Sequence, residues 1–342
     1  MKKYLLPENG NFYKANLHCH TTCSDGRLTP EQVKELYKRH GYSVVAFTDH
    51  NVFVDHSDLA DEDFLPLLSF ETDVTEPEFC NPRKTCHLCM ISLEPKNKLI
   101  LWNRNGRYRH GRSSVTTEEM NALLDDSTPD YTRFYSKAGV NDMIKIAKEN
   151  GYFVTYNHPT WSQEGYTDYT AYEGMNAFEI VNGSCLTLGY EEYNHRVYDD
   201  LLRTGHKIYC IAADDNHNCY PEGSPRSDSL IGVTMIKADK LEYRTITKAI
   251  EDGHFYATTG PEINELWFED GQLHVKCSDA VKVTLNTGIR AASAVFPTDS
   301  EFVNEAVFAV KPEYRYIRIT VRDAKGECAY TNAYFTDDLF AE

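Results

Sequence analysis

Two histidines stand one residue apart in the segment NLHCHTTCSDG, residues 16–26, and an aspartate follows them. In an extended chain His18 and His20 point to one face and Cys19 to the other, because side chains alternate along a strand. Imidazole and carboxylate groups together suit Zn, Mn or Fe. The pair therefore predicts one part of a metal site, provided that other segments supply matching ligands.

Histidines and carboxylates also follow apolar runs elsewhere in the chain. The candidate metal ligands are His18, His20, Asp25, His50, Glu71, His87, His158, Asp215 and His217. Any one of these histidines alone is more typical of a hydrogen-bonded core residue than of a ligand. Together they exceed what one tetrahedral ion needs and suit two or three divalent ions. Burying them without an ion would be costly, because each loses hydration and like charges repel.

The spacing of some ligands indicates how they are used. Asp215 and His217 flank Asn216 and are expected to repeat the alternating geometry of the first pair. Glu71 lies on a middle strand, where its two oxygens can bridge two ions. Ions held about 3.5–4 Å apart stabilise the attacking and the leaving oxygen of an in-line displacement. The set therefore predicts hydrolytic chemistry.

Seven apolar runs that end in polar clusters predict the strands that carry these groups. They span residues 12–20, 43–51, 64–74, 86–94, 151–159, 175–184 and 206–217. Helical patterns that end at a glycine occupy residues 29–41, 139–151 and 190–205. Strands that alternate with helices predict a parallel sheet, open or closed into a barrel, with the site at the C-terminal strand ends.

Two segments depart from this alternation. Residues 96–138 follow the fourth strand and are expected to cap the cleft. Their basic cluster, either a solvated loop or a contact for phosphate, comprises Arg104, Arg107, Arg109, His110 and Arg112. After residue 263 the runs become short and alternate polar with apolar residues, which predicts a small β-sandwich.

Composition limits the partners. The 342-residue chain has a formal net charge of −17, which argues against a nucleic acid polymer or an anionic membrane. No apolar run is long enough for a membrane span, and none follows the N-terminal lysines as in a signal peptide. We therefore expect a cytoplasmic protein whose 10 cysteines are reduced. Cys86 and Cys89 are interpreted as small buried strand residues rather than a redox pair.

Six ordered motifs resemble those of the PHP (polymerase and histidinol phosphatase) domain: HCHTTCSDG, FTDHN, FETDV, CHLCMIS, NHPTW and ADDNH. The resemblance covers roughly residues 12–262, and the segment that follows is similar to the CehA/McbA-like branch. It implies an α/β fold in which a distorted seven-stranded β/α barrel of the PHP/TIM type (residues 1–262) precedes a small Ig-like β-sandwich (residues 263–342).

The resemblance also implies how the ligands divide among three ions. The first ion would take His18, His20, Glu71 and Asp215; the second Glu71, His87 and His158; the third Asp25, His50 and His217. Asp49 and Asp214 would orient ligands. Arg226 and His195 are the candidates for contacting phosphate, and His195 could also protonate the leaving group.

The expected function is therefore that of a metal-dependent phosphoesterase with two or three Zn, Mn or Fe ions. A hydroxide held between the Glu71-bridged ions would attack a small phosphate ester, such as a nucleotide or sugar phosphate. One alternative is a carbamate or amide hydrolase that uses the same metal site. Another is a non-enzymatic binding module in which the β-sandwich is the working part.

Overall fold

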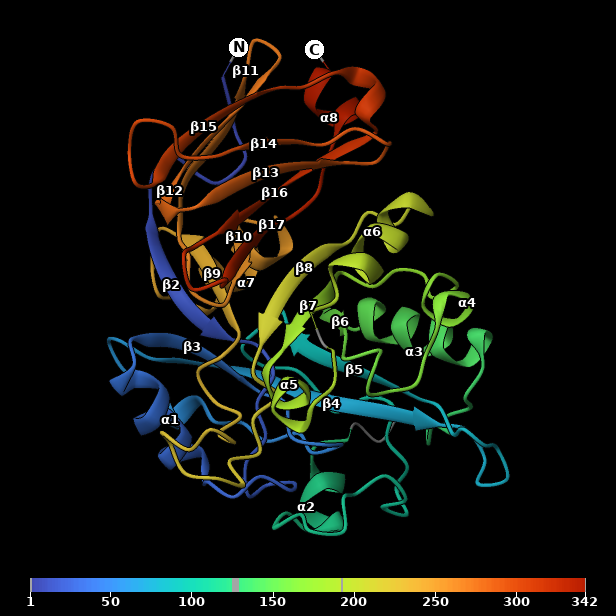
Figure 1. The fold of residues 1–342 in the computed structure, drawn as a ribbon. Helices are drawn as coiled ribbons and strands as arrows, with labels where there is room; N and C mark the ends of the chain where they lie inside the picture. Colours follow the sequence, from blue (N-terminus) through green and yellow to red (C-terminus); the bar gives the residue numbers. More distant parts are fainter. Residues whose placement is uncertain (1, 125–128, 192, 342) are drawn as a thin grey trace.

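The computed structural model describes residues 2–124, 129–191 and 193–341 of the chain. Figure 1 shows a larger lobe below and a smaller, mostly β lobe above, with both chain ends at the smaller lobe. The strands are β1 (Lys3–Tyr4), β2 (Asn11–Asn16), β3 (Tyr42–Phe47), β4 (Leu65–Thr75), β5 (Thr85–Ser92), β6 (Tyr152–Tyr156), β7 (Ala177–Asn182), β8 (Tyr209–Ala213), β9 (Val233–Ala238), β10 (Phe255–Thr258), β11 (Ile263–Glu269), β12 (Gln272–Ala280), β13 (Lys282–Thr287), β14 (Ser293–Val295), β15 (Val303–Ala309), β16 (Tyr316–Arg322), β17 (Cys328–Thr331) and β18 (Tyr334–Phe335).

Among the described residues the helices are fewer than the strands, and the fold is mixed α/β. They are α1 (Pro30–Arg39), α2 (Thr117–Ala122), α3 (Lys137–Glu149), α4 (Tyr166–Tyr169), α5 (Gly183–Leu188), α6 (His195–Arg203), α7 (Tyr243–Glu251) and α8 (Thr336–Phe340), with 3-10 turns at Ser57–Leu59 and Pro312–Tyr314. Among the described residues, no helix combines the length and the apolar character that crossing a bilayer requires.

The seven predicted strands are present as β2 to β8, and the three predicted helices as α1, α3 and α6. Local sequence explains α1 well. Thr29 caps its first turn in a capping box with Gln32, and Pro30 occupies the first helical position. Val33, Leu36 and Tyr37 recur at helical spacing and form its buried face.

The prediction of a parallel sheet is wrong for one strand. β2, β3 and β4 pair in parallel, as do β6, β7 and β8, but β5 is antiparallel to both β4 and β6. The reason is the connection between β4 and β5, which is a hairpin closed by Glu76 N–H donating to Lys84 O at 2.9 Å. A parallel pair would need a crossover of a dozen or more residues. The reversal brings the start of β5, with His87, beside the end of β4.

The expected closed seven-stranded barrel is not confirmed. The larger sheet is an open path in the order β14-β13-β16-β17-β10-β9-β2-β3-β4-β5-β6-β7-β8. Within the described ranges, β8 forms no ladder with β9 or β2. The residues just beyond β8 and β2 do meet, because Asp215 N–H donates to His18 O at 2.8 Å and His20 N–H donates to Asn216 O at 3.0 Å. The two ends of the run therefore converge at the polar edge.

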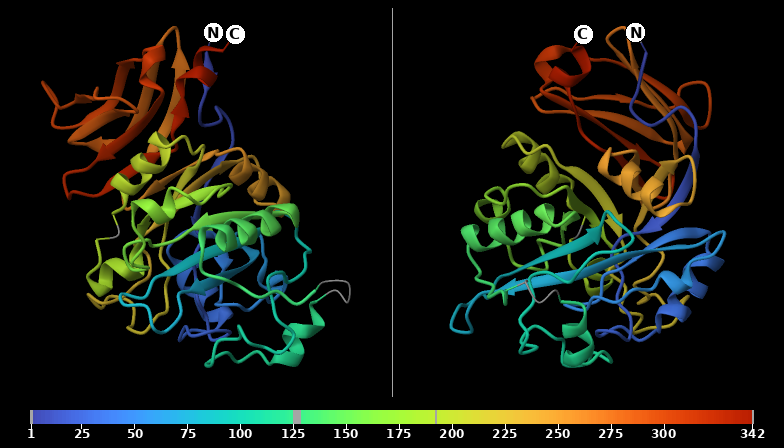
Figure 2. Two further views of the ribbon diagram at one scale, coloured as in Figure 1. Left: turned by 90° about the vertical axis from the view of Figure 1, so that its right-hand side faces the viewer. Right: turned by 180° about the vertical axis from the view of Figure 1, so that it is seen from behind.

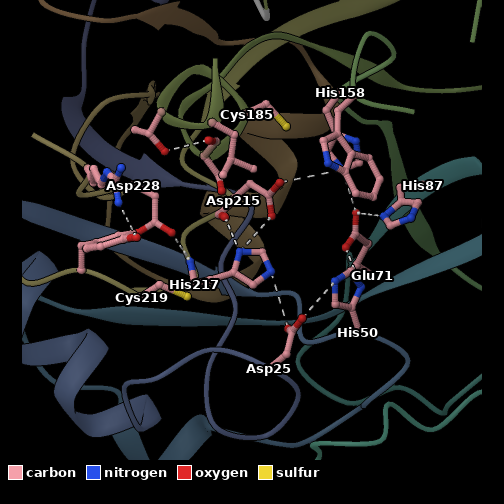
Figure 3. A pocket seen from close by; sticks show the side chains of 16 residues that line it. Asp25, His50, Glu71, His87, His158, Cys185, Asp215, His217, Cys219 and Asp228 are labelled. Atoms are coloured by element: carbon pink, nitrogen blue, oxygen red, sulfur yellow. Dashed lines mark hydrogen bonds and ion pairs between the residues drawn. The ribbon is translucent and has the colours of Figure 1, made fainter. Parts of the chain in front are cut away.

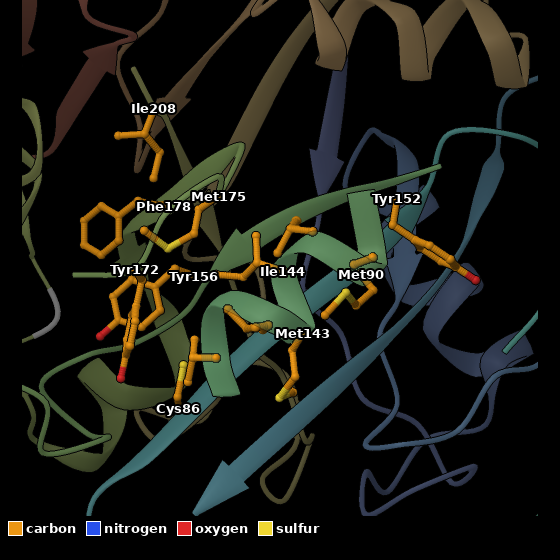
Figure 4. Close-up of a cluster of buried hydrophobic side chains, with 14 of the residues drawn as sticks. Cys86, Met90, Met143, Ile144, Tyr152, Tyr156, Tyr172, Met175, Phe178 and Ile208 are labelled. Carbon is orange, nitrogen blue, oxygen red and sulfur yellow. The ribbon is translucent and has the colours of Figure 1, made fainter. Parts of the chain in front are cut away.

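The largest apolar core lies between α3 and the sheet (Figure 4). Met143 and Ile144 of α3 face Tyr156 of β6 and Met90 of β5, and all four side chains are buried. Complete burial of such side chains stabilises the fold by about 1.5–3 kcal/mol each. This packing fixes the strands whose ends carry the polar groups.

The upper lobe is built from two sheets that share one apolar core. One sheet has the order β1-β11-β12-β15, and the other is the β13-β16-β17 end of the larger sheet. The N-terminal strand β1 pairs with β11, which the sequence did not predict. β17 pairs with β10, so backbone hydrogen bonds run unbroken between the lobes (Figure 2). The division of the chain at residues 262 and 263 stays a prediction.

A buried ion pair also joins the lobes, and its loss should be costly. Arg318 of β16 donates to Asp199 of α6 through Nε and Nη2, each at 2.9 Å, and the arginine side chain is 3% exposed. Replacing Asp199 with Ala leaves that charge buried and unpaired, which costs about 3–5 kcal/mol. We expect the melting temperature to fall by roughly 6–10 °C, at about 2 °C per kcal/mol for a large chain. Scanning calorimetry of Asp199→Ala beside the exposed control Asp299→Ala tests this; equal melting temperatures would contradict it.

Candidate metal centre

Nine side chains carried by six strands and the loops after them meet at one edge of the larger sheet. Figure 3 labels all of them except His18 and His20. His18 and His20 follow β2, and their Nε2 atoms lie 3.1 Å apart, so the predicted alternation around the buried Cys19 holds. Glu71 is on β4 and fully buried. The remaining members are Asp25, His50, His87, His158, Asp215 and His217. All the ligands predicted from the sequence therefore lie together.

The first group surrounds Asp215 and Glu71. His18 Nε2 lies 3.2 Å from Asp215 Oδ1 and 3.3 Å from Glu71 Oε1. The corresponding distances from His20 Nε2 are 2.9 Å to Asp215 Oδ1 and 3.5 Å to Glu71 Oε2. Ligand atoms about 2.1 Å from a tetrahedral ion stand about 3.4 Å apart, so these spacings suit an ion at their centre.

The second group shares the same carboxylate, through the oxygen that also faces His18. Glu71 Oε1 lies 3.1 Å from His87 Nδ1 and 3.4 Å from His158 Nε2. The indole of Trp161 stands edge-on to both imidazoles, with ring centroids 5.2 Å from His87 and 5.0 Å from His158. Glu71 therefore faces both groups, as its expected bridging role requires.

The third group is more open and centres on Asp25. Its oxygens lie 3.6 Å from His217 Nε2 and 3.9 Å from His50 Nε2. His110 approaches the same carboxylate, with Nε2 at 3.8 Å from Asp25 Oδ2. The sequence placed His110 only in a basic loop and did not predict this contact.

The donor set fits metal ions better than it fits an ion-free polar core. Glu71 Oε2 is buried and, among the described residues, has no hydrogen-bond partner. His50 Nδ1 lies only 2.9 Å from it but does not make a hydrogen bond of acceptable geometry. Two unaligned polar atoms at this distance are expected when both face a shared cation. The nine side chains of the three groups are therefore the residues that could hold divalent ions.

The protonation of the site shows how strongly the carboxylates and imidazoles interact. Burial opposes the charged ring of His158, yet the hydrogen bond that the ring donates to Glu71 and the charge of Asp215 raise its pKa to about 9. Burial likewise opposes His217, but Asp25 and Asp215 raise its pKa to about 10. His20 differs, because burial and the neighbouring His50 and His217 lower its pKa to about 4. Without metal, protonated imidazoles therefore balance the carboxylates.

These shifts predict opposite pH responses for metal-free and metal-loaded protein. A raised pKa means that the folded state holds the proton more tightly than the unfolded chain does. The stabilisation from His158 and His217 is therefore complete below about pH 6.5 and is lost as the pH rises through 9 to 10. We expect the melting temperature of metal-free protein to fall between pH 7 and pH 10. Metal affinity should rise over the same interval, because ions compete with these protons. Thermal melts and metal titrations across this range test both trends.

Several buried groups hold the ligands in place. His18 Nδ1–H donates to Glu179 Oε1 at 2.6 Å, which leaves Nε2 free to face the site. Glu179 also accepts from the backbone N–H of His158 at 3.1 Å. Glu179 was not predicted to hold a ligand, although it is the only charged residue in the apolar run of β7, and such a residue is typical of a buried polar contact. Asp49 and Asp214 are the residues expected to orient ligands. Each binds the backbone of a loop next to ligand residues.

Each of those two aspartates is saturated with hydrogen bonds. Asp49 accepts from the backbone N–H groups of Thr21 and Ser24, at 2.7 and 3.0 Å, and so holds the loop that ends at Asp25. Asp214 accepts from Tyr37 Oη–H at 2.6 Å and from three backbone N–H groups at residues 230–232. These contacts fix the backbone around the ligands.

The second predicted pair does not repeat the geometry of the first. β8 ends at Ala213, and Asp215 has a positive φ of 53°, so the chain turns instead of continuing as a strand. Asp215 consequently faces the first group and His217 the third. His158 also has a positive φ, of 26°. Such backbone costs about 1–3 kcal/mol per residue and occurs where surrounding contacts impose it, typically at functional sites.

A cavity of about 640 Å³ opens from the ligands. Trp161, Leu188 and Tyr220 contribute apolar surface to its wall, and Arg226 lies on its lining. Figure 3 shows Cys219 and Asp228 on the side of His217 that faces away from Glu71. Arg226 Nη1 donates to Tyr220 Oη at 2.9 Å, so the arginine belongs to this distal part. The volume suits a small organic ligand.

His195 is not among the residues that line this cavity. It is exposed at the start of α6, and the charges nearest to it belong to Arg318 and Asp199 rather than to the ligands. The neighbouring Asn194 donates its backbone N–H to Ile180 O at 2.7 Å, so α6 starts beside β7 but away from the cavity. The structure therefore brings Glu71 and Arg226 to the cavity, but not His195.

The expected cap is partly irregular, with α2 inside it, and residues 125–128 of it lie outside the described part of the chain. The buried Arg133 ties it down by donating to Asn51 Oδ1 at 2.6 Å and to Asp73 O at 2.9 Å. Ser113 Oγ–H donates to Cys23 O beside the third group. Of the described lining residues, none is one of the insertion arginines. The arginines of the basic cluster thus lie outside the cavity, whereas His110 of the same cluster reaches the third group.

Comparison with known proteins identifies one family. Residues 16–214 match the PHP domain family, which is more than half of the chain. No curated protein sequence matches the chain significantly.

Similar solved structures are distant in sequence. One is a two-domain protein from Bacteroides vulgatus that contains a predicted PHP-like metal-dependent phosphoesterase, with 14% identity, a TM-score of 0.43, and coverage of 97% of this chain and 98% of that chain. Another, a candidate metal-dependent phosphoesterase from Bifidobacterium adolescentis, has 18% identity, a TM-score of 0.39, and coverage of 64% and 91%. An amidohydrolase from Chromobacterium violaceum, solved with sulfate and no metal, has 18% identity, a TM-score of 0.42, and coverage of 59% and 87%.

Proposed function

The chain belongs to the PHP domain family, and from this premise we propose that it is a metal-dependent phosphoesterase acting on a small phosphate ester. The proposal includes two or three Zn, Mn or Fe ions and a substrate such as a nucleotide or sugar phosphate. The observation that carries it is the convergence of nine ligand side chains on the buried Glu71, whose Oε2 finds no hydrogen-bond partner among the described residues. Membership of the CehA/McbA-like branch stays a prediction.

The residues would divide the work as follows. The three groups defined above would hold the ions, with Glu71 shared between the first and the second. Bound divalent ions of this kind lower the pKa of water and polarise a phosphoryl oxygen. Glu179 keeps His18 in the tautomer that presents Nε2 to the site. Arg226 offers a positive charge to the substrate from the distal wall.

A carbamate or amide hydrolase is the second candidate, because the cavity wall has few cations. Arg226 is the only Lys or Arg among the described lining residues. Trp161, Leu188 and Cys185 line the same cavity and offer apolar contacts to a neutral substrate. A phosphate substrate would therefore rely mainly on the ions and on one arginine.

A panel of phosphate esters, carbamates and amides, assayed with Mn, Zn and Fe, tests the proposal. Wild type should turn over at least one phosphate ester faster than any carbamate or amide, and His20→Ala should lose that activity. Equal turnover by the two proteins would remove the assignment of these ligands. Faster turnover of a carbamate or amide would favour the second candidate.

Arg226 provides a sharper test of substrate charge. Charge-assisted hydrogen bonds are worth about 1.5–3 kcal/mol, so Arg226→Ala should raise KM for the best phosphate ester by roughly 10–100-fold. The metal content should not change, because Arg226 contacts Tyr220 rather than a ligand. Arg290→Ala, an exposed arginine of the upper lobe, is the matched control. An unchanged KM would exclude Arg226 from substrate binding.

A further inference from the structure

The histidines of the metal centre differ in what holds their second ring nitrogen. His18 Nδ1 faces Glu179 at 2.6 Å, His158 Nδ1 faces Ser162 Oγ at 3.2 Å, and His217 Nδ1 faces the backbone oxygen of Asp215 at 2.9 Å. Glu179 and the carbonyl oxygen can only accept, so they fix the proton of His18 and His217 on Nδ1, and the Ser162 hydroxyl can accept from His158 in the same way. Nε2 then remains available as a ligand. His20 does not follow this pattern.

One nitrogen of His20 belongs to the first group. Its Nε2 lies 2.9 Å from Asp215 Oδ1 and 3.1 Å from His18 Nε2. These are the spacings of atoms that share one ion, as argued above. Coordination there requires that Nε2 carry a lone pair and no proton.

The other nitrogen of His20 faces the third group. Nδ1 is buried and, within the described ranges, has no hydrogen-bond partner. Its nearest carboxylate atom is Asp25 Oδ1 at 3.9 Å, which is too far for a hydrogen bond. Two ligands that are each about 2.1 Å from one ion can be up to about 4.2 Å apart, so the distance does suit a shared ion. The atoms of His20, Asp25, His50 and His217 that could hold an ion all lie within 4.8 Å of one another.

Neighbouring rings restrict His20 to this orientation. The imidazole is stacked between His50, with centroids 4.3 Å apart, and His217, with centroids 4.4 Å apart. The residue is fully buried, so bulk solvent does not reach either nitrogen. A proton on Nε2 would block the first group, and a proton on Nδ1 would have no acceptor. Neither neutral tautomer satisfies both sides of the ring.

We propose that His20 is a bridging ligand, which binds one ion through Nε2 in the first group and another through Nδ1 in the third. The inference rests on the proposed metal-dependent function and adds a covalent link between two of its ion positions. A neutral imidazole has one N–H, so when the second ion binds the ring releases that proton to solvent and becomes an imidazolate. Its two lone pairs then form the two metal–nitrogen bonds.

The bridge couples the two positions. Filling the first group orients the ring and makes Nδ1 a better ligand, so the third ion should bind more tightly after the first. By linkage, the third ion strengthens the first by the same factor. Asp25, His50 and His217 alone would give a third position that fills independently.

Nitrogen NMR on the full chain tests the bridge directly. The protein is labelled with ¹⁵N-histidine and loaded with ¹¹³Cd, and the resonances of His20 are identified by their loss in His20→Gln. We expect both ring nitrogens of His20 to show one-bond coupling to cadmium and no ring N–H to remain. A retained Nδ1–H, or coupling at one nitrogen only, would overturn the bridge, as would failure of cadmium to occupy both groups.

Calorimetry supplies a second readout that a structural role would not change. His20→Gln keeps a polar group near the position of Nε2 but none near Nδ1. It should lower the affinity for the third ion by about 10–100-fold or more, although Asp25, His50 and His217 are unaltered. The binding enthalpy of the third ion, measured in buffers with different heats of ionisation, gives the number of protons released on binding. This number should be one smaller in His20→Gln than in wild type. His254→Gln, outside every cluster in the described part of the chain that could hold an ion, is the matched control. Unchanged third-ion affinity in His20→Gln would contradict the bridge. These readouts do not depend on turnover, so an inactive protein with a coupled His20 would refute only the proposed function.

Discussion

Replacing Glu71 with Gln should lower kcat/KM for the best phosphate ester by more than about 1,000-fold. The amide keeps the shape of the side chain but loses the negative charge that both groups face and one of the two carboxylate oxygens. Metal ions supply several kcal/mol of transition-state stabilisation, and each 1.4 kcal/mol is about tenfold in rate. Steady-state kinetics together with elemental analysis should show the loss of activity and of at least one ion per chain.

Glu164 offers a matched control for this substitution. It is also a buried glutamate, but it accepts hydrogen bonds from Tyr135 at 2.8 Å and Tyr156 at 2.7 Å and lies outside the three groups. Glu164→Gln should keep its metal content and most of its activity, even if its melting temperature falls. Glu71→Gln protein with full metal content and normal kinetics would remove the bridging carboxylate from the mechanism.

Removing the ions should destabilise the protein more than any single substitution discussed above. An ion present at a thousand times its Kd stabilises the folded state by about 4 kcal/mol. At about 2 °C per kcal/mol for a large chain, each ion contributes roughly 8 °C to the melting temperature. Without ions, Glu71, Asp215 and Asp25 depend on protonated histidines for compensation.

Thermal melts with and without a chelator measure this effect. The melting temperature should recover when Mn or Zn is added back in excess of the chelator. Glu71→Gln should show a smaller chelator effect than wild type, because it has already lost an ion. If neither the chelator nor added metal changes the melting temperature, the three groups do not hold ions.

The sequence predicts the ligands better than it predicts the path of the chain between them. His18 and His20 could be placed together because alternation along a strand is a local property. The ends of β2, β3 and β4 follow from apolar runs in the same way. The reversal of β5 could not be read from its own residues, because it depends on the short connection at 76–84.

The remaining surprises depend on contacts between distant segments. Asp215 and His158 adopt positive φ angles, which are uncommon for residues other than glycine and which the surrounding contacts impose. His110 reaches Asp25 only because the insertion is anchored near Cys23. His195 was assigned by its place after β7, whereas the fold turns α6 toward the upper lobe. Long-range geometry of this kind leaves little trace in a single sequence.

The unbroken hydrogen-bonding between β10 and β17 has a practical consequence for dissecting this molecule. A polypeptide terminated after residue 262 would lose β17 and leave the backbone N–H and C=O groups along that side of β10 unpaired. An exposed edge strand of this kind can pair with strands of other molecules, which promotes aggregation. The part that carries the candidate metal centre, residues 1–262, is therefore expected to be poorly soluble when expressed alone, and melting of the intact protein should occur in one transition rather than two.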